Sequence, residues 1–362
     1  MSGTAEPQAT LVLPGGLTES LAFRRSASSR GLRLVGASSV HNDPAREKYD
    51  EWCYVPSVHD TGFEAAFCDA LKVHNISTVY SPHGIIHSRL TQLAAKLGHS
   101  FELSNPRPTD ELEENVQEDI VEARRHLAFM QTLGTGGAML DEREIAGLLR
   151  ATRHIAGQSD EDKLSAIMAV FPELPRGDIV EIGGFWGRSA YVLAWLAGRY
   201  QVGSALVVDP WAVADALQMS APEIVRADTK SQNWDLVHQG FILNLVPIAH
   251  GRLGYLRMSS ADAVVQYSAF PAALDSPPFG LAQFTGAVSL LHIDGNHDEE
   301  AVTLDIEKWV GRVQPGGWLV LDDYVWPHGD GPYRAGNALL DKLADRSLRS
   351  FVAGKALFIQ LG

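Results

Sequence analysis

The sequence has only two cysteines, Cys53 and Cys68, among its 362 residues. Their spacing matches no metal-binding pattern, and so few cysteines fit a reducing, cytoplasmic location. Long apolar runs are also missing, because the longest fall far short of the ~20 residues needed to cross a bilayer. The N-terminal sequence MSGTAEPQAT lacks the positive-then-apolar layout of a signal peptide. We therefore expect a cytoplasmic protein with no membrane partner.

Positive charge is scarce as well. The chain has 30 Lys and Arg against 44 Asp and Glu, a formal net charge of −14. A protein that binds nucleic acid normally presents a basic groove to the phosphates, and no basic run appears here. The sequence therefore argues against a nucleic-acid partner. Its length predicts two domains, and a hydrophobic content of 45% is that of a globular protein with sizeable cores.

What the sequence does have is a glycine-rich segment, VEIGGFWGRSA, at residues 180–190. It predicts a buried strand, a turn with Gly183, Gly184 and Gly187, and a helix after the last glycine. Glycines let a backbone approach a ligand closely, and a helix N-terminus presents free N–H groups. Glu181, at the end of the strand, can accept hydrogen bonds from hydroxyl or ammonium groups. Together these features predict a small-molecule cofactor pocket at the edge of a parallel sheet.

The spacing Glu-x-Gly-x-x-x-Gly differs from the dinucleotide pattern and resembles the first motif of class I S-adenosylmethionine (SAM) methyltransferases. A second predicted strand, residues 204–211, ends in Asp209. A carboxylate at this position can hold a ribose diol, and in these methyltransferases an acidic residue does so. Trp211 is then placed to lie against the adenine ring. The alternative is that Asp209 is a turn residue before Pro210.

A third strand end is predicted at residues 255–262. In SAM methyltransferases this segment lies beside the adenine, so the resemblance points to Ser260 as a cofactor contact. Ser260 can equally cap the helix that follows, because serine is favoured at helix N-termini. Both roles can hold at once.

A second informative block covers residues 287–327 and contains two predicted strands separated by a helix. The first strand ends in Asp294 and the second in Asp322 and Asp323. Because the carboxyl ends of parallel strands share one edge of a sheet, these carboxylates should converge beside the cofactor pocket. A cation would relieve their repulsion, and oxygen ligands favour Mg²⁺. The alternative is that they are aspartates solvated in loops.

The ordered combination of HIDGNH, DIEKW and PGGWLVLDDY resembles the class I methyltransferases that include macrocin-type and other antibiotic and sugar O-methyltransferases. Metal-dependent catechol O-methyltransferases are more distantly similar. The resemblance covers residues 176–362 and implies an α/β fold with a seven-stranded, Rossmann-like sheet. It also implies Mg²⁺ held by Asp294, Asp322 and Asp323, with Asp294 bordering the SAM site as well.

His297, three residues after Asp294, is the predicted general base, where the catechol enzymes carry a lysine. An imidazole with an ordinary pKa of about 6.5 suits proton removal near neutral pH. The departure from lysine leaves other roles open, such as a residue behind the metal ligands or a loop donor. His292, within the strand, is interpreted as a hydrogen-bonded core histidine.

A rival motif, Ser-Pro-Pro-Phe, stands at residues 276–279. Amino-methyltransferases acting on adenine, cytosine or glutamine use this pattern at the end of the fourth strand. Here HIDGNH takes that position, so we interpret the two prolines as part of a loop.

The N-terminal half alternates strands and helices, which predicts a second, smaller α/β unit of Rossmann type. With Pro14-Gly15-Gly16, VPSVHD at 55–60 and SPHG at 81–84, it resembles the domain that precedes ATP-grasp domains, although no ATP-grasp domain follows. We expect this domain at residues 1–106, a helical linker at 107–175 and the methyltransferase domain at 176–362. The linker is expected to cover the SAM pocket or to form a dimer interface.

The sequence therefore predicts a SAM-dependent O-methyltransferase, assisted by Mg²⁺, that modifies a hydroxyl of a small molecule such as a sugar or a secondary metabolite. Two alternatives stay open. One is a non-catalytic or regulatory SAM-binding module, and the other is a metal-independent methyltransferase with His297 as its base. A homo-oligomer is also compatible with the sequence.

Overall fold

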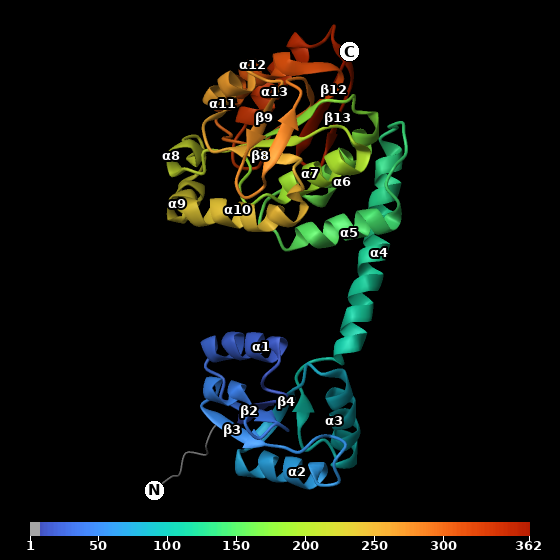
Figure 1. Ribbon diagram of the computed structural model, residues 1–362, viewed down its shortest axis with the longest axis vertical. Coiled ribbons are helices and arrows are strands. Elements are labelled where there is room, and N and C mark those ends of the chain that lie inside the picture. Colours follow the sequence, from blue (N-terminus) through green and yellow to red (C-terminus); the bar gives the residue numbers. More distant parts are fainter. Residues whose placement is uncertain (1–7) are drawn as a thin grey trace. The chain divides into compact units, whose positions relative to one another are not determined.

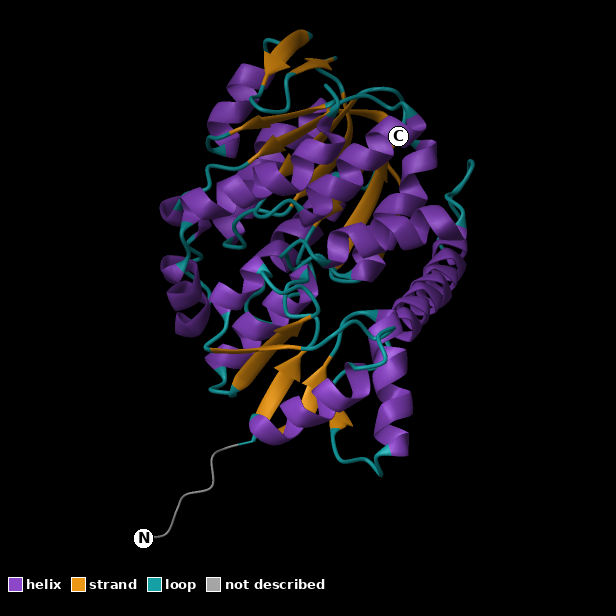
Figure 2. Ribbon diagram, turned by 60° about the horizontal axis from the view of Figure 1, so that its bottom comes forward, coloured by secondary structure: helices purple, strands orange, loops and turns teal. Residues whose placement is uncertain are grey.

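The computed structural model describes residues 8–362, which form two compact units (Figure 1). One unit ends at Glu118 and the other runs from Asp119 to Gly362. The α/β fold predicted from the sequence is confirmed in both: each has a mainly parallel sheet with helices on its two faces (Figure 2).

The N-terminal unit has a five-stranded parallel sheet in the order β3-β2-β1-β4-β5. Helix α1 packs on one face, and helices α2 and α3 pack on the other through a core that includes Phe67 and Leu90. Two of its strands lie at the sheet edges: β3 is only partly buried, and β5 has two residues. The elements are β1 (Ala9–Val12), α1 (Thr18–Ser29), β2 (Leu34–Ser38), the 3₁₀ helix η1 (Pro44–Lys48), β3 (Glu51–Tyr54), α2 (Phe63–Val73), β4 (Ile76–Tyr80), α3 (Gly84–Lys96) and β5 (Glu102–Leu103).

The predicted helical segment consists of α4 (Pro108–Thr132), α5 (Glu142–Arg153), α6 (Glu161–Val170) and the 3₁₀ helix η2 (Phe171–Glu173). Helix α5 begins with a capping box, in which Asp141 and Glu144 satisfy backbone N–H groups of the first turn. Leu148 of α5 and Ile167 of α6 are buried in the same core as the helix after the glycine-rich turn. Helices α5 and α6 therefore belong to the C-terminal unit rather than forming a separate linker.

The C-terminal unit is built on a seven-stranded sheet in the order β13-β14-β12-β11-β6-β7-β8. Strands β8, β7, β6, β11 and β12 are parallel, and β14 pairs antiparallel with both β12 and β13. The strands are β6 (Asp178–Ile182), β7 (Ala205–Val208), β8 (Leu253–Leu256), β11 (Val288–Ile293), β12 (Val313–Leu321), β13 (Ser347–Ala353) and β14 (Ala356–Leu361).

Both faces of this sheet are covered, as the uninterrupted apolar strands require. Along β6, Ile179 faces a core shared with α5, α6, α7 (Arg188–Tyr200) and α10 (Trp234–Ala249). Its neighbour Val180 faces the opposite core, shared with α11 (Ser260–Tyr267), α12 (Glu299–Trp309) and α13 (Gly331–Lys342). Figure 1 shows the two helical layers on either side of the strands. The 3₁₀ helix η3 (Val310–Arg312) joins α12 to β12.

Two insertions interrupt the alternation of strands and helices in this unit. Helices α8 (Val213–Ala216) and α9 (Glu223–Ser231) follow β7, and a hairpin of β9 (Ala272–Asp275) and β10 (Leu281–Phe284) precedes β11. The Ser-Pro-Pro-Phe segment lies in the turn of that hairpin and contributes nothing to the main cavity described below. Strand β6 lies between β7 and β11. The strands that follow β6 in the chain are placed first on one side of it and then on the other, so the strand order reverses at β6. Such a reversal leaves a crevice at the carboxyl ends of the strands.

Candidate active site

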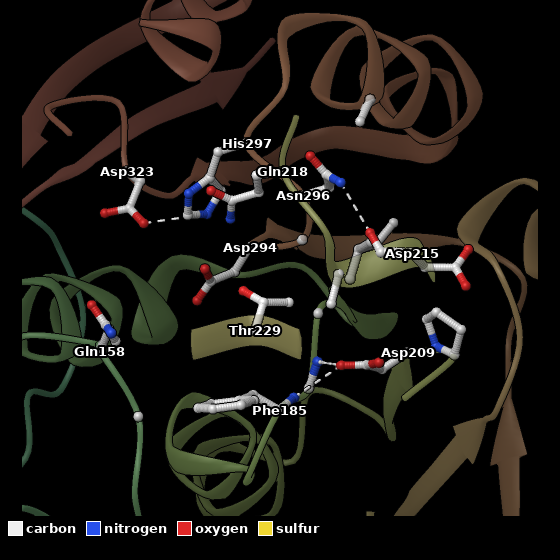
Figure 3. Close-up of a pocket in the computed structure, with 18 of the residues that line it drawn as sticks. Gln158, Phe185, Asp209, Asp215, Gln218, Thr229, Asp294, Asn296, His297 and Asp323 are labelled. Atoms are coloured by element: carbon white, nitrogen blue, oxygen red, sulfur yellow. Dashed lines mark hydrogen bonds and ion pairs between the residues drawn. The ribbon is translucent and has the colours of Figure 1, made fainter. Parts of the chain in front are cut away.

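A cavity of about 810 Å³ opens at this crevice (Figure 3). Its volume lies within the ~300–1,000 Å³ of typical ligand pockets. It is lined by the ends of β6, β7 and β11, by the insertion after β7, by the start of α11 and by the loops before α6 and after β12. Of the predicted site residues, those on the lining are Gly183, Gly184, Asp209, Ser260, Asp294, His297 and Asp323.

The glycine-rich turn is shaped by contacts inside the protein. Gly183 has φ of +92°, and a Cβ atom there would overlap the backbone carbonyl of Asp294. A Cβ atom on Gly184 would collide with the side chain of Val207. Gly187 is the N-cap of α7 and does not line the cavity. Gly183 therefore lets the turn approach the end of β11, Gly184 lets it approach β7 and Gly187 lets it approach α10. Of the three glycines, Gly183 and Gly184 also border the cavity.

Asp209 organises the same turn from the neighbouring strand. Its Oδ2 accepts hydrogen bonds from the backbone N–H groups of Gly184 (2.8 Å) and Phe185 (3.0 Å), and its Oδ1 accepts one from Trp211 N–H (2.6 Å). Burial raises the pKa of Asp209, and these three donors partly oppose that shift. Each carboxylate oxygen can accept more than one hydrogen bond. Asp209 can thus receive a ligand hydroxyl while it holds the turn.

Two predicted cofactor contacts lie away from the cavity. The Glu181 side chain is buried and pairs with His292 Nδ1 on β11 at 2.9 Å, because the two residues are register partners on adjacent strands and point to the same face of the sheet. Trp211 is 1% exposed and packs on Phe241, and its indole N–H donates to the carbonyl of Phe185. The structure does not bring either side chain to the ligand space, so their predicted direct contacts need correction.

Ser260 borders the cavity at the first residue of α11, and its hydroxyl donates to Asp305 on α12. The helix is capped by Ser259 instead, whose hydroxyl accepts from the backbone N–H of Asp262. Asp305 lines the same part of the cavity, where burial raises its pKa to about 6 despite the opposing hydrogen bond from Ser260. The sequence reasoning missed this carboxylate.

The raised pKa of Asp305 makes the stability of the protein depend on pH. A raised pKa favours the folded state most below the unfolded value of 3.8, and this advantage is lost as the pH rises through about 6. Asp305→Asn keeps an acceptor for Ser260 without a charge. As the pH rises from about 5 to about 7.5, we expect the unfolding free energy of the variant, relative to that of the wild type, to increase by roughly 1–2 kcal/mol. Equal pH dependence of the two proteins in denaturant unfolding would contradict this.

The strand-end aspartates are joined by a cation that the sequence reasoning missed. Lys163, on α6, has a side chain with no solvent exposure, and its ammonium group donates to Oδ2 of Asp294 at 3.2 Å and to Oδ2 of Asp322. The signal in the sequence is a single charge at the start of the apolar helix KLSAIMAV. Nothing in that signal names its partners, which lie 131 and 159 residues away.

The pKa shifts of this cluster follow from its geometry. Burial alone would lower the pKa of Lys163, but the two carboxylates more than offset it and the pKa lies above its ordinary value. Asp322 contacts the ammonium most closely, which outweighs burial and lowers the pKa of Asp322. Burial and the charge of Asp322 raise the pKa of Asp294. The cluster thus holds one fixed positive charge beneath the cavity.

The predicted magnesium ligands do not form one set. Strand β12 ends at Leu321, and Asp323 lies in the following turn with a left-handed φ of 47°. The chain therefore changes direction at this point, and Asp322 turns inward to Lys163 while Asp323 lines the cavity. Among residues 8–362, the possible ligand groups that contain these aspartates are His292–Asp294–Asp322 and Asp294–His297–Asp323, never all three aspartates. Because Lys163 already binds two of the predicted ligands, the three-aspartate magnesium site does not fit this structure.

His297 and Asp323 form a pair on the cavity wall, as Figure 3 shows. His297 Nε2 lies 3.2 Å from Asp323 Oδ2, and Nδ1 is buried without a hydrogen-bond partner. The ring of Trp326 packs edge-on against the imidazole at 4.7 Å between centroids. Burial lowers the pKa of His297 to about 4. Burial, with the nearby charge of Asp322, raises the pKa of Asp323 to about 6.

The other polar residues of the HIDGNHD loop hold the insertion that follows β7. Asn296 donates its side-chain N–H to the carbonyls of Asp215 (2.9 Å) and Leu217 (3.1 Å). Asp298 accepts hydrogen bonds from the backbone N–H groups of Met219 (2.7 Å) and Ser220 (2.9 Å). The loop therefore has two tasks: Asp294, Asn296 and His297 line the cavity, and the side chains of Asn296 and Asp298 also hold the insertion that covers it.

Residues 180–324 match the model of a family described as a methyltransferase domain. No curated protein matches the sequence. Similar solved structures include the O-methyltransferase NovP, with 13% identity, a TM-score of 0.37 and coverage of 63% of this chain and 83% of that one. Others are the calicheamicin methyltransferase CalS11 (13% identity, TM-score 0.39, 63% and 96% covered) and TomG from Streptomyces achromogenes (16%, 0.37, 62% and 92%). At these identities and TM-scores, the similarities say nothing about the acceptor.

The C-terminal unit therefore contains a methyltransferase domain, an enzyme domain, at residues 180–324. Within residues 8–362, no helix combines the length and the apolar character needed to cross a membrane.

Proposed function

We propose that this enzyme transfers a methyl group from SAM to a hydroxyl of a small molecule, with His297 as the general base. One observation carries the proposal: a single cavity joins the glycine-rich turn and Asp209 to the His297–Asp323 pair. A cofactor held by the turn and an acceptor beside the imidazole would thus share one enclosed space, as group transfer requires.

The charge of the cavity suits SAM. Among residues 8–362, Arg188 is the one lysine or arginine on the lining. Its Nε is buried without a partner, so the guanidinium is available for the carboxylate of the methionine part. The acidic lining favours the sulfonium and ammonium charges of SAM and disfavours a polyphosphate ligand. When bound, SAM supplies an electrophilic methyl group. The lining aspartates are Asp209, Asp215, Asp228, Asp294, Asp305 and Asp323.

His297 is arranged to remove the proton of an acceptor hydroxyl. With Asp323 ionised, the Nε2–H group donates to its carboxylate, which leaves the lone pair on Nδ1 free. His297 would accept the hydroxyl proton at Nδ1 as the bond from oxygen to the methyl carbon forms and the bond from that carbon to the sulfonium sulfur breaks, which leaves a neutral thioether. The Asp323 carboxylate would stabilise the imidazolium. Magnesium has no part in this proposal, because Lys163 occupies two of its predicted ligands.

The alternative of a non-catalytic SAM-binding module is less well supported. A binding module needs no oriented base, whereas His297 has a carboxylate on one nitrogen and a free lone pair on the other. The insertion after β7 covers the cavity with residues such as Gln218 and Thr229 (Figure 3), and we propose that it selects the acceptor among sugars or secondary metabolites.

A calorimetric titration of SAM into the full chain tests the cofactor half of the proposal. We expect one site per chain in the wild type. In Asp209→Asn one carboxylate oxygen becomes an NH₂ group, so a charged hydrogen bond to the turn or the ligand is lost, worth ~1.5–3 kcal/mol. SAM affinity should fall by about 10–100-fold. Transfer to hydroxyl compounds is then followed by mass spectrometry.

Asp235→Asn is the matched control for this titration. Asp235 is largely exposed, pairs with Arg257 and does not line the cavity, so SAM binding should be unchanged. Absence of SAM binding to well-folded wild-type protein would overturn the proposed function.

A further inference from the structure

We propose that the ammonium group of Lys163 takes the place of a divalent cation among the strand-end carboxylates, so that this methyltransferase works without a metal. The inference about the reaction rests on the proposed function, whereas the inference about the cation rests on the protein alone. Lys163 acts as a positioning residue, since it lies beneath the cavity and not on its lining.

The position of Lys163 is fixed by the fold. It stands in the first turn of α6, where Asp160 caps the helix by accepting a hydrogen bond from the backbone N–H of Lys163 at 2.8 Å. The second oxygen of Asp160 accepts one from the backbone N–H of Lys355, in the turn between β13 and β14. The whole side chain of Lys163 is buried. The ammonium therefore cannot swing aside into solvent to admit an ion.

The charges also speak against a second cation at this place. Asp294 and Asp322 together supply two negative charges and Lys163 neutralises one of them. A divalent ion bound to the same carboxylates would lie next to the ammonium, with little solvent to screen the repulsion. The carboxylates can bind either the ammonium or the metal ion.

On the cavity side, the other possible ligand group that contains these aspartates already uses one oxygen of each carboxylate within the protein. In the Asp294–His297–Asp323 group, Asp294 is bound to Lys163 and Asp323 is paired with the imidazole. Mg²⁺ prefers several oxygen ligands in near-octahedral geometry. Lys163 thus holds Asp294 at the cavity floor, and the His297–Asp323 pair removes the proton without help from a metal.

Binding of Mn²⁺, used as a spectroscopic probe for Mg²⁺, tests the proposal in the absence of SAM. Electron paramagnetic resonance should show no stoichiometric Mn²⁺ site in the wild-type chain, and EDTA should leave methyl transfer unchanged. In Lys163→Gln the two carboxylates lose their cation, so we expect a new site with one Mn²⁺ per chain. That site should disappear when Asp322→Asn is added. If Lys163→Gln lowers kcat, added Mg²⁺ should partly restore it. Such a rescue is not expected if Lys163 has only a structural role.

Each of these measurements can overturn the proposal. One Mn²⁺ per chain in the wild type, removed by Asp322→Asn, would overturn the proposal, as would activity that EDTA abolishes and Mg²⁺ restores. A folded Lys163→Gln variant that binds no Mn²⁺ would overturn the exchange of lysine for metal. If that variant does not fold, the two wild-type measurements still decide. Lys308→Gln, at an exposed position of α12, is the control and should bind no Mn²⁺. A failure of SAM binding would instead count against the proposed function.

Discussion

The His297→Asn variant is expected to transfer methyl groups with kcat lowered by about 10²–10⁴-fold, the usual contribution of a positioned general base. Asparagine retains a polar side chain but cannot take up a proton near neutral pH. SAM affinity should stay close to that of the wild type, because His297 lies at the far side of the cavity from the Asp209 turn (Figure 3). Steady-state kinetics and a SAM titration of the same preparation measure the two effects.

The pH dependence of kcat should report the His297–Asp323 pair. The first proton that the pair binds belongs to Asp323, whose pKa is raised to about 6, because the pKa of His297 is lowered to about 4. A protonated Asp323 donates to Nε2 and moves the imidazole N–H to Nδ1, which removes the free lone pair. We therefore expect kcat to be constant above this pKa and to fall as the pH drops through about 6.

Two variants serve as controls for this profile. Asp323→Asn should lower kcat and remove the inflection near pH 6, because the titrating carboxylate is gone. His250→Asn, at the exposed end of α10, should change neither quantity. If His297→Asn retains kcat within about threefold of the wild type, His297 is not the base. Such a change in the activation free energy is smaller than the ~1.4 kcal/mol that corresponds to a tenfold change in rate.

The sequence predicts the fold well because the fold depends on patterns that are local. The apolar run at 178–182, the glycines after it and the apolar stripe of the helix at 299–309 specify β6, its turn and α12 without reference to distant residues. Strand-end positions are equally local, which explains why Asp209, Asp294 and Asp323 were assigned to one edge of the sheet and do line one cavity.

Side-chain direction and long-range partners could not be predicted in the same way. Asp322 and Asp323 are adjacent in sequence, yet they face a buried lysine and the cavity, respectively. Lys163 belongs to a helix that the sequence reasoning treated as a linker, and its partners lie on distant strands. A metal was inferred because the carboxylates needed a positive charge. In this structure, the ammonium group of Lys163 contacts two of those carboxylates.

The N-terminal unit has the parallel α/β architecture that the sequence predicts. Its similarity to the domain that precedes ATP-grasp domains stays a prediction, as does a role for it in binding a substrate or a partner. A helix of the C-terminal unit, α6, shows the limit of assigning domains by composition. It reads as part of a connecting segment, yet all its residues from Lys163 to Val170 are buried.

Lys163→Met is expected to lower the free energy of unfolding by about 3–5 kcal/mol, the usual cost of breaking a buried ion pair by removing one partner. Methionine nearly matches lysine in length and helix propensity, so the effect isolates the charge. The variant leaves the buried carboxylate of Asp322 and the partly buried one of Asp294 without a cation. Denaturant unfolding followed by tryptophan fluorescence reports the C-terminal unit, since all eight tryptophans except Trp52 lie beyond Glu118.

A second substitution separates the loss of charge from a loss of packing. In the double variant Lys163→Met with Asp322→Asn only one carboxylate is left uncompensated, so part of the lost stability should return, whereas a packing defect would persist. Lys308→Met, at an exposed position of α12, should change the unfolding free energy by no more than about 0.5 kcal/mol. A loss below about 1 kcal/mol in Lys163→Met would show an ion pair no stronger than those on protein surfaces. In that case Lys163 could not be the cation that holds the strand-end carboxylates together.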